Sequence, residues 1–162
     1  MLTLLDTFAL APPFSLREQN TGSIEAWIYS TLSADTHVVA LASTRIYEDI
    51  VPQNASYPAI TYSLISEEHG YTLNNTNRQV TNRIQVSCWA TSGVVRRQLG
   101  DAIADALDGY RGTSNGKVIQ SCFIDNVTNV YEASAGNEAQ RLYGKHIDFE
   151  ITHVIETPDR TE

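Results

Sequence analysis

The four histidines are the side chains best suited to acid–base or metal chemistry, and they stand apart in the sequence. They occupy positions 37, 69, 146 and 153. No two of them have the spacing of two, three or four residues that would bring a pair of metal ligands together in advance. His69 falls in a polar stretch, His37 in an expected helix, and His146 and His153 on opposite faces of one expected strand. The histidines therefore predict no metal centre.

Paired carboxylates are the next candidates for chemistry. Glu67-Glu68 and the pair Asp148 and Glu150 place acids close together, but paired acids on a protein surface are commonly solvated. The sequence also lacks a G-x-S-x-G nucleophile motif, a phosphate-binding loop and a G-x-G-x-x-G dinucleotide motif. We therefore predict a protein without enzymatic activity, cofactor or metal.

The overall charge limits the partners of this chain. Its 19 acidic and 11 basic residues give a net charge of −8, which argues against binding of a phosphate backbone. An acidic protein can nevertheless lie beside DNA without adhering to it. No apolar run approaches the ~20 residues of a membrane helix, so we expect no membrane partner.

The length and the cysteines indicate a single reduced domain. A chain of 162 residues can bury roughly 70% of its unfolded surface without a disulfide or a metal. The apolar opening imitates a signal peptide but lacks a basic start and contains Asp6, so we expect synthesis in the cytoplasm. Cys88 and Cys122 fall on the apolar sides of two expected strands and are expected to be small buried hydrophobic residues.

The chain divides into three parts. Residues 1–22 contain Pro12-Pro13, which interrupts any helix, and are either a short helix folded back on the domain or an arm that docks on a neighbouring chain. Residues 23–157 form the expected single domain, and residues 158–162 form a C-terminal tail.

Periodicity predicts the elements of the domain. Ser23 and Asp35 are good N-caps for two leading helices, with Val38, Val39 and Leu41 on the buried side of the second. A third helix begins after Thr91 or Ser92 and ends at Gly109, which can adopt the left-handed conformation. Alternating apolar residues predict strands from residue 58, residue 80, residue 117, residue 127 after a tight turn, and residue 143. The expected fold is α+β, with a mainly antiparallel sheet of about five strands and helices packed on one face.

A long polar connection between the first two of these strands is the first indication of a functional surface. The segment from Glu67 to Gln79 exceeds what a tight hairpin needs. We expect it to be mobile alone and to become ordered against a neighbouring subunit. The candidate contact residues are Glu67, Glu68, His69, Tyr71, Leu73, Asn74, Asn75 and Arg78.

Two further surfaces are candidates for contacts. Alternation on the last strand turns Asp148 and Glu150 away from the core, where they are either ordinary solvated acids or channel and interface acids. The polar side of the third helix carries Arg96, Arg97, Asp101 and Asp105. That side is either a solvated helix face or a face that meets charges on another subunit.

Taken in order, these elements resemble the tail completion proteins of long-tailed bacteriophages, also called tail terminators or head-to-tail joining proteins. The resemblance runs from about residue 24 to residue 155. It rests on the leading helical pair, on RIYEDIVPQNASYPAITYSLIS and GYTL, on RIQVSCWA passing into a helix that ends ALDGYRG, and on YGKHIDFEI. Residues 1–22 lie outside it.

The resemblance implies a structural virion protein of the neck. Family members form a ring of six copies that caps the head-proximal end of the tail tube, stops its growth and joins the tail to the head connector. The implied partners are other copies of this chain, the tail tube protein and the connector or stopper protein, while DNA passes nearby without specific binding.

Two other functions remain as alternatives. A different neck component, such as a head-completion or adaptor protein, would stay with heads where a terminator stays with tails. A small-ligand-binding α+β domain would require an enclosed pocket with converging polar groups, which the sequence does not indicate.

Overall fold

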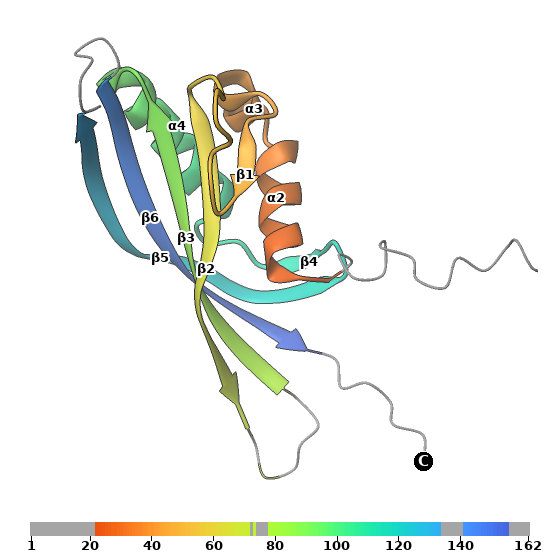
Figure 1. Ribbon diagram of the computed structural model, residues 1–162. Helices are drawn as coiled ribbons and strands as arrows, with labels where there is room; N and C mark the ends of the chain where they lie inside the picture. Colours follow the sequence, from red (N-terminus) through yellow and green to blue (C-terminus); the bar gives the residue numbers. More distant parts are fainter. Residues whose placement is uncertain (1–21, 72, 74–77, 134–140, 156–162) are drawn as a thin grey trace, which may run out of the picture.

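The computed structural model describes residues 22–71, 73, 78–133 and 141–155 (Figure 1). The predicted arm (all but Gly22) and C-terminal tail lie outside this part of the chain. The helices are α2 (Ile24–Ala34), α3 (Thr36–Ala42) and α4 (Gly93–Leu107). The strands are β1 (Ile46–Glu48), β2 (Ala59–Gly70), β3 (Arg78–Ala90), β4 (Gly112–Ser114), β5 (Lys117–Ala133) and β6 (Arg141–Ile155).

Side-chain caps fix where the helices begin, as the sequence predicts. The hydroxyl of Ser23 accepts a hydrogen bond from the first turn of α2, and the carboxylate of Asp35 accepts two from α3. Ser92, the second of the two predicted candidates, caps α4. These bonds satisfy N–H groups that have no partner within the helix. At the other end of α4, Gly109 has a φ of 74°, which confirms the predicted helix stop.

The sheet is larger than predicted, and it is mixed. Its six strands follow the order β1-β2-β3-β6-β5-β4. Strand β1 runs parallel to β2, while every other pair is antiparallel. The α+β class is confirmed, but the expectation of about five mainly antiparallel strands is corrected. Strand β1 can be parallel because the chain between β1 and β2 doubles back before β2 begins, and β4 escaped prediction because it has only three residues.

Strand β5 also corrects the prediction of two strands joined by a tight turn. It runs unbroken from Lys117 to Ala133, and its pairing with β6 shifts by one residue between Ile124 and Asn126. Asp and Asn favour turns, but here Asp125 is the extra residue of a β-bulge.

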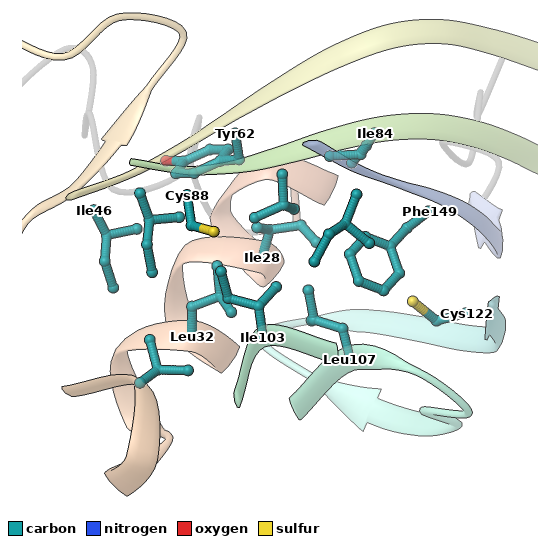
Figure 2. Packing of buried hydrophobic residues seen from close by; sticks show 14 of the residues in the cluster. Ile28, Leu32, Ile46, Tyr62, Ile84, Cys88, Ile103, Leu107, Cys122 and Phe149 are labelled. Carbon is teal, nitrogen blue, oxygen red and sulfur yellow. The ribbon is translucent and has the colours of Figure 1, made fainter. Parts of the chain in front are cut away.

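The core lies between the helices and one face of the sheet (Figures 1 and 2). Figure 2 shows Ile28 and Leu32 of α2 and Ile103 and Leu107 of α4 in one cluster with Phe149 of the sheet. All five side chains have no measurable exposure. In α3, Val38 is buried as predicted, whereas Val39 is 38% exposed, because a seven-residue helix turns only a narrow side inward. None of the described helices is both long and apolar enough to cross a membrane.

Candidate functional site

The predicted connection between β2 and β3 is strand at both of its ends. Strand β2 continues to Gly70 and pairs with β3 from Ala59↔Trp89 to Gly70↔Gln79. Glu67, Glu68 and His69 are therefore ladder residues. The sequence predicted a loop here because this part of β2 is exposed on both faces. Such a strand lacks the alternation of apolar and polar residues by which strands are recognised.

This β2–β3 hairpin extends beyond the helical layer (Figure 1). At its end Tyr71 is 75% exposed and Leu73 is fully exposed. The ring of His69 stacks on Tyr71 with 6.3 Å between centroids. Asn74, Asn75 and the side chain of Arg78 lie outside the described residues. The tip thus presents apolar groups to solvent, as a contact surface does.

An irregularity in β2 adds apolar surface to the same hairpin. The pairing with β3 shifts between Leu64 and Ser66, which leaves Ile65 as the extra residue. Leu64 is 38% exposed and Ile65 is 54% exposed. A bulge twists a strand and redirects its side chains, so the hairpin carries apolar groups along its length as well as at its tip.

A chain of hydrogen bonds ties the base of the hairpin to β6. Asn82 donates its side-chain N–H to Glu67 over 3.0 Å, and its oxygen lies 2.8 Å from Nε2 of His153. His69 contacts the other oxygen of Glu67 at 2.7 Å. Because the Asn82 amide nitrogen is used for Glu67, its oxygen must accept from His153, which places the histidine proton on Nε2.

The charges in this chain follow from its hydrogen bonds and its burial. The bond from Asn82 lowers the pKa of Glu67 against an opposing effect of burial, and the contact with His69 lowers it further. Burial lowers the pKa of His153, and the nearby Lys117 adds to this. Burial also lowers the pKa of Lys117. We conclude that Glu67 is ionised and His153 is neutral near pH 7.

The sheet face opposite the helices carries a second polar cluster. Although burial alone would raise the pKa of Asp148, hydrogen bonds from Gln85 and Arg83, both of 2.9 Å, lower it overall. Arg83 also reaches Asp125 at 3.1 Å. Asp148 faces away from the core as predicted, but it is only 7% exposed. The charge of Asp148 is paired with that of Arg83. Glu150, by contrast, is exposed to solvent.

An aromatic group lies further along this face. The Trp89 ring meets the His146 ring edge-on with 5.5 Å between centroids, and Nδ1 of His146 lies 2.6 Å from the Ser87 hydroxyl. A Cβ on Gly144 would come within 2.7 Å of the Trp89 ring. Glycine is therefore required here for the indole to lie across β6.

The predicted polar side of α4 is largely solvated. Arg97, Asp101 and Asp105 are exposed, and Asp101 contacts Lys145 at 3.3 Å. Arg96 is half-buried, and its Nε has no hydrogen-bond partner among the described residues. The helix face therefore presents one basic and two acidic exposed groups.

The two cysteines lie in the core. Cys88 and Cys122 are unpaired and fully buried, which confirms them as small hydrophobic residues. Burial raises the pKa of the Cys88 thiol to about 11 and that of Cys122 to about 12. Within the described ranges, no three His, Cys, Asp or Glu residues gather as a metal site.

Several residues of these clusters escaped the sequence reasoning. Arg83 and Gln85 could be placed on the polar side of β3, but their partner Asp148 is more than 60 residues away. The turn between β4 and β5 contains a recognisable sequence signal, Asn115-Gly116. Asn115 and Gly116 both have positive φ, and Asn-Gly is a strong hairpin signal.

Comparisons with known proteins agree with the fold. The family model described as tail completion protein gp17 matches residues 26–153. Among solved structures, a chain described as "Virion of native gene transfer agent (GTA) particle" has a TM-score of 0.61 and 18% sequence identity. That alignment covers 83% of this chain and 96% of the other. No curated protein gives a significant match.

Proposed function

This chain belongs to the tail completion protein gp17 family, and from that membership we propose that it forms a ring at the head-proximal end of a phage tail tube. In this role it ends growth of the tube and joins the tail to the head connector. The observation that carries the proposal is the family match over residues 26–153. This range covers α3, α4, all but the first two residues of α2, and all but the last two strand residues.

The shape of the molecule supports a role in assembly. The β2–β3 hairpin reaches past the helices (Figure 1) and ends in the exposed Tyr71 and Leu73. We propose that this hairpin contacts a neighbouring copy or the tail tube, with these two side chains as apolar anchors. A head-to-tail contact of this kind closes into a ring when the rotation between subunits is right. We propose that the ring has six copies. We further propose that it belongs to a phage with a long non-contractile tail.

The distribution of charge supports a place beside DNA. The net charge of −8 disfavours binding to phosphates. Glu150 is the exposed acid of β6, and we propose that it borders the channel, where repetition around a ring multiplies a weak repulsion. The exposed charges Arg97, Asp101 and Asp105 on α4 are proposed as a second subunit contact.

Electron microscopy of isolated tails tests this proposal. Tails carrying a tagged copy of the chain are expected to show a labelled ring at one end and to yield crosslinked species up to six copies. Label that remains on heads would instead identify a head-completion or adaptor protein. Tails that yield only monomers or two-fold dimers after crosslinking would refute the ring.

A further inference from the structure

Strand β5 lies near one edge of the sheet, and β4 pairs with only its first residues. Two bonds from the chain before β4 cover the next part of this edge. The Gly109 N–H donates to the Cys122 carbonyl over 2.8 Å. The Ile124 N–H donates to the Asp108 carboxylate over 3.1 Å. Both bonds show that this part of β5 directs the backbone groups of Cys122 and Ile124 away from β6.

The same edge of β5 continues without a partner strand in the described part of the chain. Ile124 pairs with Phe149 of β6, and Val127, Asn129 and Tyr131 pair with residues of β6 that alternate in phase with Phe149. Backbone direction alternates along a strand, so the N–H and C=O groups of these three residues also point away from β6. We call this stretch, residues 127–131, the free edge of β5.

The free edge lacks the features that commonly keep a sheet edge from pairing. Its sequence is VTNVY, which contains no charged residue and no Pro. On the helix side, Tyr131 is 50% exposed and meets Tyr143 edge-on, with 5.5 Å between ring centroids. An uncharged strand edge beside an exposed aromatic ring is a template for a further strand.

The chain enters the described fold beside the start of β5. A Cβ on Gly22 would lie 3.9 Å from Cε of Lys117. Ten residues of strand separate Lys117 from Val127, which is about 33 Å at roughly 3.3 Å per residue. Residues 12–21 are also ten in number and span about 33–36 Å when extended. Residues 1–11 can therefore reach the free edge, running antiparallel to β5.

The sequence of residues 1–11 suits a strand with one apolar face. Large apolar residues share one phase of a two-residue repeat and threonines fall on the other, with Leu2, Leu4, Phe8 and Leu10 against Thr3 and Thr7. Asp6 is the single charged side chain of the segment. Pro12-Pro13 follows at once and would end such a strand, because proline has no N–H to donate.

We propose that residues 1–11 add a strand to the free edge of β5 within the same subunit. The added strand runs antiparallel to β5 and pairs with the backbone groups of Val127, Asn129 and Tyr131. Its apolar side chains pack against Tyr131 and Tyr143. The family match begins only at residue 26, so this strand is an addition to the family's fold. The contact lies within one subunit and does not depend on the proposed ring.

Amide hydrogen exchange of the isolated full-length protein, followed by NMR, tests this pairing. The amides of Val127, Asn129 and Tyr131 should exchange slowly only if a strand covers the free edge. The amides of Thr128 and Val130 point toward β6 in either case and serve as references.

A double variant, Leu4→Asp with Phe8→Asp, should remove the added strand. The three edge amides should then exchange at least about tenfold faster, with the references unchanged. Leu16→Asp is the matched control, because it adds a charge outside residues 1–11 and should leave the exchange unchanged. Edge amides that exchange as fast as exposed amides in the wild type, or equally slowly in the double variant, would overturn the proposal.

A nitroxide label tests whether the added strand comes from the same subunit. Thr128→Cys carries the label, and the native Cys88 and Cys122 are fully buried and do not compete for it. The label should broaden the resonances of residues 1–11 in its own molecule and leave them sharp in unlabelled copies mixed with it. Broadening only in the mixed copies would assign the strand to a neighbouring subunit and overturn the intramolecular contact. Helical chemical shifts in residues 1–11 would overturn the strand itself.

Discussion

The two halves of strand β2 differ in what surrounds them. From Ala59 to Tyr62 all four residues are buried, and from Leu64 to Gly70 all are exposed. The inner half lies between β1 and β3 and beneath α2, whereas β1 ends opposite Tyr62. The outer half therefore has a ladder partner on one side only.

The two halves of β2 therefore have different roles: the inner half contributes to folding stability, and the outer half to contacts with other molecules. The inner half contributes side chains to the core, and burial of apolar area is the main source of folding free energy. The outer half is held by backbone pairing and by the polar chain through Glu67, Asn82 and His153. Changes to the outer half should therefore alter assembly and leave most of the folding free energy intact.

The largest effect is expected on assembly. Replacement of residues 71–78 by Asn-Gly would join the paired Gly70 and Gln79 through a two-residue turn. The free energy of unfolding should stay nearly unchanged, while phage titre should fall by orders of magnitude because the proposed contact is lost. Val127→Thr changes a 44% exposed apolar residue of β5, outside both the hairpin and α4, and should leave the titre normal. A normal titre in the shortened variant would refute the role of the hairpin.

The next effect compares two isoleucines of the same strand. Ile60 is fully buried and Ile65 is 54% exposed. Ile60→Ala should lower the free energy of unfolding by about 2–5 kcal/mol through lost burial and a cavity. Ile65→Ala should change it by less than about 0.5 kcal/mol. Urea unfolding of both variants measures the difference, and similar losses would contradict the division of β2 into two halves.

A smaller effect is expected at the base of the hairpin. Asn82→Ala would leave Glu67 and His153 without their shared partner, which should cost about 1–3 kcal/mol of unfolding free energy. Gln79 is on the same strand as Asn82, and its side chain donates an exposed hydrogen bond to Gln120. Gln79→Ala should therefore cost much less unfolding free energy than Asn82→Ala. If urea unfolding gives equal losses for the two variants, the polar chain does not hold the hairpin base.

The smallest effect concerns pH. The folded pKa values of Asp148, Glu67 and His153 are all lowered, so the folded state binds fewer protons and stability should rise with pH. Stability should fall as the pH drops below about 6.5, because His153 must then take up a proton that the folded state disfavours. It should fall again below about 4, where Asp148 and Glu67 become protonated. Urea midpoints measured from pH 7.5 to pH 3 should show both declines.

Asp148→Asn separates the contributions. This variant should be less stable near pH 7, because Arg83 loses one of its two ionised partners and keeps only Asp125. It should lose less stability below pH 4. His153 remains, so the decline below pH 6.5 should persist. A wild-type midpoint that does not change with pH would contradict the assignment of these charges.

Local physical chemistry explains which parts of the fold the sequence determined. Ser23, Asp35 and Ser92 cap their helices because a short polar side chain can reach the first free N–H groups. Alternation identified the buried face of β6, with Ile147, Phe149 and Ile151 inside. The order of these elements also sufficed to indicate the family. The caps and the alternation each depend on residues close together in the chain.

Only the tertiary structure decided the features that join distant segments. The direction of β1 is set by its parallel pairing with β2. Asp125 is a bulge residue because the ladder with β6 continues on both sides of it. The pairing of Asp148 with Arg83 and the seating of Trp89 on Gly144 depend on strand register. Register is fixed by the packing of the whole sheet, which no short stretch of sequence encodes.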